Sequence, residues 1–216
     1  EIREPRFDFI DENCGKVRIS EEKRIGKSRA DVMLVMDGML AGIEIKSDAD
    51  TYARLERQIA YYNRCFDIKY VVVGSSHGAH ITEHVPDWWG IITVEECSSG
   101  TQDNPDTPGD KSAQNKPAPS GVDFYVLRRP DLNPRRHHEF FRKRQLDFLW
   151  RPELAHIQAA HGLHKYAKKS KLFVRNYILE SIPEDVLKKE ITDELFERDS
   201  DKLLKEIEDY NGKRQK

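Results

Sequence analysis

Cysteine is scarce in this chain, and its cysteines lie far apart. The 216 residues include three, Cys14, Cys65 and Cys97, and no two of them have CxxC spacing. An odd number of scattered cysteines argues against a disulfide framework and against a zinc finger, so we expect a reducing, cytoplasmic setting. The sequence also has no apolar run of about 18 residues and no visible signal peptide, so we expect no membrane association.

The sequence has no glycine-rich phosphate loop and no internal repeat, but its charge is unevenly distributed. Residues 1–100 contain 13 Lys and Arg against 18 Asp and Glu, a net charge of −5. Residues 135–175 contain 11 Lys and Arg against 3 Asp and Glu, a net charge of +8. This division suggests metal or acid chemistry in the first segment and an anionic partner for the second.

A hairpin is the central predicted element. Residues 30–36 and 39–46 are two apolar runs, and Asp37-Gly38 between them is the dipeptide that most strongly signals a hairpin turn. We therefore expect two antiparallel strands joined by a tight turn.

Three charged residues lie on these otherwise apolar strands. Asp31 is at the start of the first strand, and Glu44 and Lys46 share one face of the second, because strand side chains alternate with period two. Charged side chains on central strands are costly to bury unless a metal ion or an opposite charge compensates them.

Further runs predict a mixed central sheet flanked by helices. Residues 69–74 follow a predicted helix, so we expect a strand parallel to residues 39–46. Residues 122–128 have a strand pattern, and we expect them to pair with residues 91–95. The chain beyond residue 134 has a helical pattern. The predicted class is an α/β core with a small all-α C-terminal domain.

We expect the chain to divide into three parts. Residues 1–132 would form the α/β core, and within them residues 97–121, rich in Ser, Asn, Asp, Pro and Gly, would form a mobile hairpin insertion. Residues 133–183 would form a basic helical module. Residues 184–216 would form a charged helical tail, whose last residues either fray or dock on a protein partner.

The helix expected over residues 48–65 follows the hairpin directly. Asp50 or Thr51 can cap its N-terminus. Gln58 and Tyr62 are four residues apart and therefore lie on the same side of the helix. This side faces the sheet, because apolar residues share its spacing.

The segment before Asp31 is basic and has two open interpretations. Lys23, Arg24, Lys27 and Arg29 surround a predicted turn at Gly26. They either approach a phosphate group or form a solvated loop, and the sequence favours neither.

Asp31, followed thirteen residues later by Glu44-Ile45-Lys46, resembles the active-site signature of the PD-(D/E)XK nuclease superfamily. Gln58 and Tyr62 match the QxxxY element of its RecB-like and lambda-exonuclease-like branch. Glu4, on a predicted opening helix, is placed like the extra acid of many members. The chain departs from the signature at Ala30, where the family has proline.

The resemblance implies a restriction-endonuclease-like core and metal-dependent hydrolysis of DNA. Hard oxygen ligands favour Mg²⁺ or Mn²⁺. Lys46 would orient or deprotonate the attacking water, and Gln58 and Tyr62 would fix the carboxylates or a phosphate. The alternative is a non-catalytic nucleic-acid-binding or adaptor protein on a nuclease scaffold. The expected metal ligands are Asp31, Glu44, the Ile45 carbonyl and Glu4.

The basic helical segment resembles a SAP-like helix–loop–helix DNA-binding module, through Leu154, Gly162-Leu163, Val174 and Ile178. Backbone phosphate contacts give affinity without sequence choice. The alternative is a solvated basic helical hairpin. The settings of bacterial proteins with this two-part layout suggest DNA repair or phage defence. The expected DNA-binding residues are Lys165, Lys168, Lys169, Lys171 and Arg175.

Overall fold

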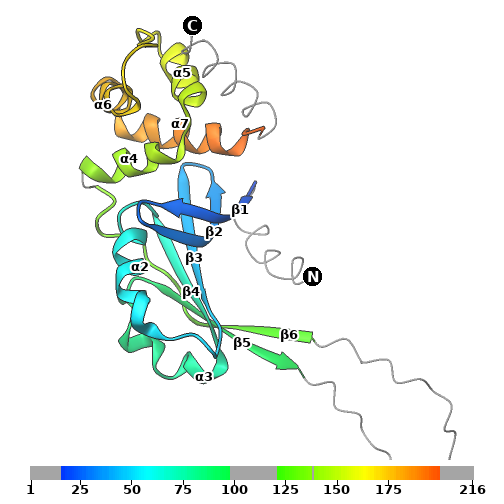
Figure 1. Ribbon diagram of the computed structural model, residues 1–216. Coiled ribbons are helices and arrows are strands. Elements are labelled where there is room, and N and C mark those ends of the chain that lie inside the picture. The colour runs from blue at the N-terminus through cyan, green and yellow to red at the C-terminus, as the bar shows by residue number, and fades with distance from the viewer. Residues whose placement is uncertain (1–15, 98–120, 138, 200–216) are drawn as a thin grey trace, which may run out of the picture.

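The computed structural model describes residues 16–97, 121–137 and 139–199 (Figure 1). The predicted opening helix with Glu4, nearly all of the predicted insertion and the end of the predicted tail lie outside these residues. No helix in the described part of the chain is long and apolar enough to cross a membrane.

Six strands form one mixed sheet in the order β1-β2-β3-β4-β5-β6. The pairs β1/β2, β2/β3 and β5/β6 are antiparallel, and the pairs β3/β4 and β4/β5 are parallel. The predicted α/β class with a mixed sheet is therefore confirmed. The strands are β1 (Arg18–Ile25), β2 (Ser28–Met36), β3 (Met39–Lys46), β4 (Ile68–Gly74), β5 (Gly90–Cys97) and β6 (Gly121–Arg128).

Two tight turns connect the first three strands, and each contains a glycine with positive φ. Gly38, at φ 64°, closes the predicted hairpin, in which Met36 pairs with Met39. Gly26, at φ 66°, lies between β1 and β2. A Cβ on Gly26 would lie 2.8 Å from Cε1 of Tyr61, so this turn packs directly on the Tyr61 ring.

The crossover between β3 and β4 is helical, as predicted, but its helix begins later. A 3-10 turn, η1 (Tyr52–Arg54), leads into helix α2 (Leu55–Tyr62). The Asp50 carboxylate accepts hydrogen bonds from the Ser47 N–H at 2.9 Å and the Ser47 hydroxyl at 2.8 Å. Asp50 therefore stabilises a turn after β3, and its predicted role as a helix cap is wrong. Thr51, the predicted alternative, is the N-cap residue of η1, but its side chain makes no capping hydrogen bond.

The β5/β6 pair confirms that the chain returns to the sheet after the predicted insertion. Thr93 pairs with Tyr125, and the ladder continues to Cys97 opposite Gly121. Figure 1 shows this pair extending away from the sheet, on the side opposite the C-terminal helices. Between β4 and β5 lie the short helices α3 (Ser75–Gly78) and η2 (Ile81–Glu83).

The chain beyond residue 134 is helical, as predicted. The Ser170 hydroxyl accepts a hydrogen bond from the Phe173 N–H at 3.2 Å and so caps α6. Figure 1 shows these helices gathered at one end of the sheet. They are α4 (Glu139–Gln145), η3 (Leu146–Phe148), α5 (Arg151–Ala160), α6 (Lys171–Ser181) and α7 (Glu184–Phe196).

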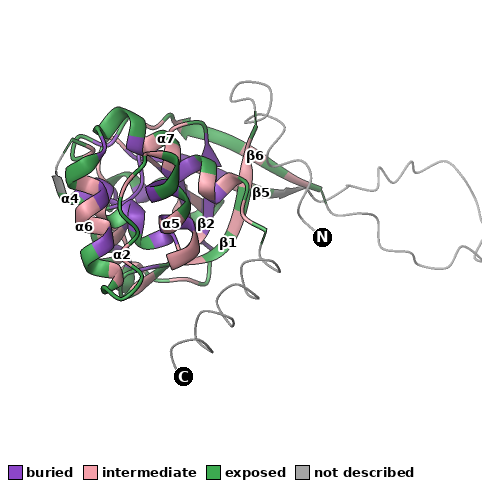
Figure 2. Ribbon diagram, turned by 90° about the horizontal axis from the view of Figure 1, so that it is seen from above, coloured by how far each residue is buried: buried purple, intermediate pink, exposed green. Residues whose placement is uncertain are grey.

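One large apolar core includes both the sheet and the C-terminal helices. It contains Met33 of β2, Leu55 and Tyr62 of α2, Leu154 of α5 and Leu187 of α7, all buried. Figure 2 shows buried segments in both the helices and the sheet. A second, smaller core lies on the other face of β2 and β3. The division of the chain near residue 132 stays a prediction.

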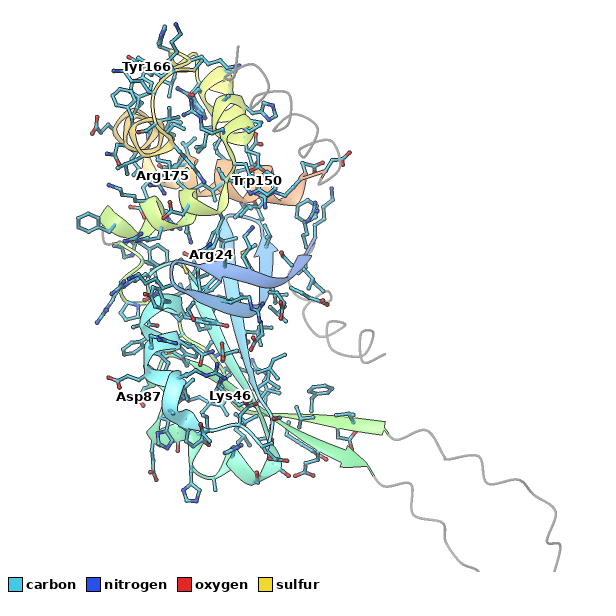
Figure 3. All side chains as sticks on the ribbon, viewed as in Figure 1. Arg24, Lys46, Asp87, Trp150, Tyr166 and Arg175 are labelled. Atoms are coloured by element: carbon cyan, nitrogen blue, oxygen red, sulfur yellow. The ribbon has the colours of Figure 1, made fainter. Side chains whose placement is uncertain are left out.

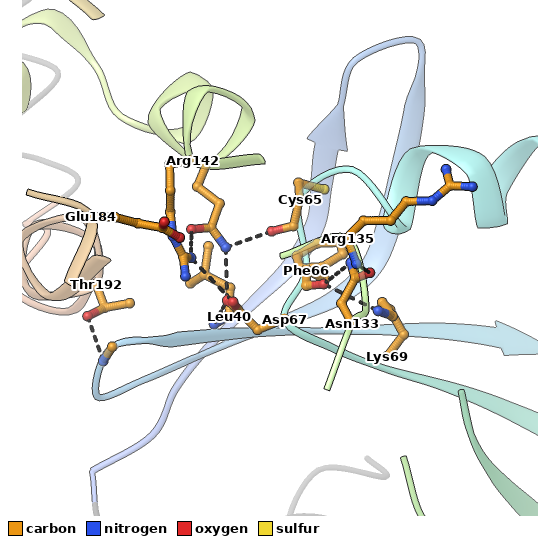
Figure 4. A network of polar contacts seen from close by, with 12 residues as sticks. Leu40, Cys65, Phe66, Asp67, Lys69, Asn133, Arg135, Arg142, Glu184 and Thr192 are labelled. Atoms are coloured by element: carbon orange, nitrogen blue, oxygen red, sulfur yellow. Dashed lines mark hydrogen bonds and ion pairs between the residues drawn. The ribbon is translucent and has the colours of Figure 1, made fainter. Parts of the chain in front are cut away.

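A buried polar network centred on Asp67 joins the helices to the sheet (Figure 4). The Asp67 carboxylate accepts hydrogen bonds from the Leu40 N–H and from Gln145 Nε2, each at 2.9 Å. Its other oxygen pairs with Arg142 at 3.3 Å, and Arg142 also contacts Glu184. Because a low-dielectric interior strengthens such contacts, this network fixes α4 against the start of β3.

Replacing Asp67 should destabilise the protein strongly. Asp67→Ala leaves the Arg142 guanidinium and the Leu40 N–H without their buried partner, and we expect a loss of about 3 kcal/mol in the free energy of unfolding. Asp193→Ala is the matched control, because Asp193 is exposed on α7 and pairs only with the exposed Lys189, at 3.1 Å, among its described ion pairs. The control should lose less than about 1 kcal/mol. Urea denaturation of both variants measures the difference, and equal losses would contradict the role of the network.

Candidate active site

An open pocket of about 630 Å³ lies where β2, β3 and α2 meet. It contains all the predicted catalytic residues of the hairpin, with Asp31 from β2, Glu44 and Lys46 from β3, and Gln58 from α2 in its lining. Figure 3 labels Lys46 at this position, on the side of Arg24 that faces away from the C-terminal helices.

Glu44 and Lys46 form a buried ion pair at the floor of the pocket. Their side chains are 1% and 6% exposed, and Lys46 Nζ lies 2.7 Å from Glu44 Oε1. The two side chains share one face of the sheet because they are two residues apart on one strand. Their contacts to Gln58 show that this face is the one that α2 covers. The charges therefore compensate each other where water is largely excluded.

Helix α2 supplies two more contacts to this pair. Gln58 Oε1 accepts a hydrogen bond from Lys46 Nζ at 3.1 Å, and Gln58 Nε2 donates one to Glu44 Oε1. The Tyr62 hydroxyl lies 2.8 Å from Glu44 Oε2 and 3.0 Å from the Ile43 carbonyl oxygen. The four-residue spacing of Gln58 and Tyr62 thus brings both to Glu44, as the sequence predicted.

Asp31 approaches the site from the neighbouring strand. Its Oδ2 accepts a hydrogen bond from the Ile45 N–H at 2.7 Å, and its own N–H lies 3.3 Å from the Tyr62 hydroxyl. The β2/β3 ladder ends at Val32 opposite Ile43, so at Asp31 a side chain takes the place of a backbone contact. The carboxylate is thereby fixed beside the Ile45 backbone.

Burial makes the two carboxylates resist ionisation. Desolvation raises the pKa of Asp31 above its ordinary value of 3.8. Desolvation, together with the nearby charge of Asp31, raises the pKa of Glu44 above 4.5, although Lys46 acts in the opposite direction. Burial and the adjacent Glu44 also raise the pKa of Tyr62, so its hydroxyl stays protonated. A cation beside Asp31 and Glu44 would relieve this electrostatic cost.

The donor set fits a hard divalent cation. Two carboxylates and a carbonyl oxygen, from Asp31, Glu44 and Ile45, are the ligand types that Mg²⁺ and Mn²⁺ prefer. Within the described residues, no group of three or more His, Cys, Asp or Glu side chains could hold a metal ion. The predicted fourth ligand, Glu4, lies outside those residues.

Positive side chains surround the acidic floor. Arg24 of β1, Lys27 of the β1/β2 turn and Arg29 of β2 line the pocket, so the basic segment adjoins the predicted site. Arg54 and Arg57 also line it, and the sequence analysis missed them. The sequence could have indicated them, because Arg54 and Arg57 lie four residues and one residue before Gln58. Arg54 ends η1, and Arg57 is in the first turn of α2.

The predicted DNA-binding residues of the helical module separate into two groups. Lys165, Lys168 and Lys169 are exposed on the loop between α5 and α6. Lys171 Nζ instead donates to the Asp147 carbonyl oxygen at 3.1 Å, and Arg175 forms an ion pair with the Asp147 carboxylate. Lys171 and Arg175 are therefore already bonded to groups of the protein itself.

Comparisons with known proteins give a partial match. A family model described as bacteriophage P4 protein cII matches residues 12–104, less than half of the chain but including the pocket residues of β2, β3 and α2. A solved structure, a protein of unknown function from Silicibacter pomeroyi, is similar at 19% identity over 69% of this chain and 86% of its own, with a TM-score of 0.34. No curated protein matches the chain. None of these comparisons names an activity for the pocket.

Mn²⁺ or Mg²⁺ should stabilise the protein in a pH-dependent way. Because the pKa values of Asp31 and Glu44 are raised, the metal-free protein loses stability as the pH rises above their ordinary values of 3.8 and 4.5. The cation binds the ionised forms, so the gain in melting temperature should grow over the same rise in pH. We expect about 5 °C at neutral pH with the metal at about a hundred times its Kd.

Thermal melts with and without metal, from acidic to neutral pH, measure this gain. Glu44→Gln should abolish it, whereas Glu56→Gln, which changes an exposed acid on α2, should retain it. A full gain in Glu44→Gln would place the metal elsewhere.

Proposed function

We propose that this chain is a metal-dependent deoxyribonuclease that hydrolyses phosphodiester bonds in the pocket between β2, β3 and α2. The observation that carries the proposal is the joint placement of Asp31, Glu44 and Lys46, with Gln58 and Tyr62 bonded to Glu44. These residues resemble the PD-(D/E)XK signature in type and order, apart from Ala30, where the signature has proline. The proposal includes a restriction-endonuclease-like core, DNA as substrate and action in the cytoplasm.

In this proposal Asp31, Glu44 and the Ile45 carbonyl hold Mg²⁺ or Mn²⁺. When bound, such an ion neutralises charge on the phosphoryl oxygens and lowers the pKa of an attacking water. Gln58 and Tyr62 hold the Glu44 carboxylate in one orientation through contacts to both of its oxygens.

Lys46 would assist the attacking water. Its ammonium group lies at the pocket floor and shares its hydrogen bonds between Glu44 and Gln58. From there it can orient the water or stabilise negative charge that develops on the phosphoryl oxygens. Arg29, Arg54 and Arg57 line the pocket and would neutralise neighbouring phosphates of the strand.

A buried ion pair also bears on the choice between an enzyme and a simple binder. Removing both charges in favour of apolar residues often leaves a protein as stable or more stable, so Glu44 and Lys46 are poorly explained by stability alone. A perturbed, buried carboxylate in an open pocket is more typical of a functional site. This reasoning favours catalysis over the non-catalytic alternative.

Cleavage of DNA tests the proposal directly. Wild-type protein should cut plasmid or linear DNA with Mg²⁺ or Mn²⁺ and not with EDTA. Glu44→Gln removes a metal ligand, and Lys46→Met removes the ammonium group while keeping most of its volume, so each should lower the rate roughly a hundredfold or more. Gel assays of the cleavage rate measure the effect.

Glu56→Gln serves again as a control, because this exposed acid is on the same helix but does not line the pocket. Equal activity in wild type, Glu44→Gln and Lys46→Met would remove the proposed site. Inactivity of all three, with salt-sensitive binding to DNA, would instead support the non-catalytic binder.

A further inference from the structure

A second pocket adjoins the candidate active site across the β1/β2 turn. Its volume is about 280 Å³, and it shares Arg24 and Lys27 with the first pocket. The turn at Gly26 therefore forms a wall common to both pockets. On the far side, α4 and η3 close the second pocket through Arg144 and Phe148. In Figure 3, Arg24 lies between Lys46 and the C-terminal helices.

The second pocket combines an aromatic surface with a positive rim. Tyr61 contributes the aromatic surface, and the buried Phe148, which stacks on Phe66, closes the pocket. Arg24, Lys27, Arg64 and Arg144 contribute four positive charges against the single acid Asp147. Arg144 pairs with Asp147 only loosely, at 3.5 Å, and its side chain is 54% exposed. This composition suits a ligand that is both planar and anionic.

Tyr61 and the exposed Arg64 form one cation–π pair in this pocket, and a planar ring can stack on this pair. The Arg64 guanidinium lies 5.5 Å from the centre of the Tyr61 ring. Gly26, which has no Cβ, packs against the edge of that ring and holds it in place. Aromatic rings and arginine guanidinium planes are the groups on which unpaired nucleobases stack.

The size and position of the pocket favour one nucleotide of a single strand. Its volume is near the lower end of the range for small-ligand pockets, about 300–1,000 Å³. In a duplex, the face of each base is covered by its neighbours, whereas an unpaired base exposes its face for stacking. The arginines and the lysine at the rim can bind the flanking phosphates.

We propose that this pocket binds one unpaired nucleotide of a single-stranded DNA segment whose neighbouring phosphate lies at Asp31 and Glu44. The proposal rests on the proposed function for the identity of the polyanion as DNA. The strand would pass over the β1/β2 turn, with Arg24 and Lys27 contacting the phosphate between the two pockets. The substrate would then be single-stranded, or would have a single-stranded end.

Affinity for single-stranded DNA tests this inference independently of cleavage. The probes are a labelled oligothymidine of about 20 nucleotides and a duplex of the same length, measured by fluorescence anisotropy in EDTA at fixed salt. Arg64→Ala combined with Arg144→Ala should weaken binding of the single strand about tenfold or more. Both side chains are exposed, so the fold should be preserved.

The matched control is Arg129→Ala combined with Lys188→Ala, which removes two positive charges at positions that do not line either pocket. It should weaken binding of the single strand and of the duplex only slightly. Equal losses in the two double variants, or an equal loss for the duplex and the single strand in the pocket variant, would overturn the inference.

Stacking itself has a separate readout. A 2-aminopurine base within the oligonucleotide loses fluorescence when it stacks, so binding to wild-type protein should quench it. Tyr61→Leu keeps an apolar side chain beneath Gly26 and should reduce this quenching. Unchanged quenching would contradict the nucleotide pocket. Because no assay here requires metal or cleavage, an inactive enzyme would remove the proposed function and leave these results intact.

Discussion

The buried Asp67 carboxylate connects the three parts of the chain on which the candidate site depends. Asp67 follows α2, and its carboxylate and backbone N–H both bind Leu40, near the start of β3. The same carboxylate binds α4 through Arg142 and Gln145. At its other end β3 carries Glu44 and Lys46, and they meet α2 through Gln58 and Tyr62. Strand β3 and the segment from α2 to Asp67 are thus bonded at two points, at Leu40 and at Glu44 with Lys46. The candidate site lies at the second point.

The sequence predicted the sheet and most of the site because the signals are local. Alternation of side chains and the Asp37-Gly38 turn determine the β2/β3 hairpin, and once the hairpin forms, Glu44 and Lys46 must share a face. The spacing of Gln58 and Tyr62 is equally local. The site also requires α2 to pack on the face of the sheet that carries Glu44 and Lys46. The apolar residues of α2 specify this packing.

Other features were not predictable, either because one residue suits two competing local motifs or because they depend on contacts between distant residues. Asp50 resembles a helix cap in sequence, yet its carboxylate binds Ser47. Arg175 counts toward a basic segment, but it is paired with Asp147, 28 residues earlier. The approach of Arg144 to the β1/β2 turn depends on how the C-terminal helices pack on the sheet. Charge counts along the chain therefore overestimate the positive charge available to a partner.

The Tyr62 hydroxyl has one hydrogen and two oxygen acceptors within reach, Glu44 Oε2 at 2.8 Å and the Ile43 carbonyl at 3.0 Å. While Glu44 is ionised, the Tyr62 hydroxyl donates mainly to the carboxylate, and its hydrogen bond to the Ile43 carbonyl oxygen is weaker. If Glu44 takes up a proton, its carboxyl group becomes a weaker acceptor, and the Tyr62 hydroxyl can donate its hydrogen bond to the Ile43 carbonyl oxygen instead. The protonation state of the acid is thereby communicated to the backbone of β3, one residue before the acid itself. Tyr62→Phe would separate the two, leaving the ring in the core while the strand no longer responds to the charge beside it.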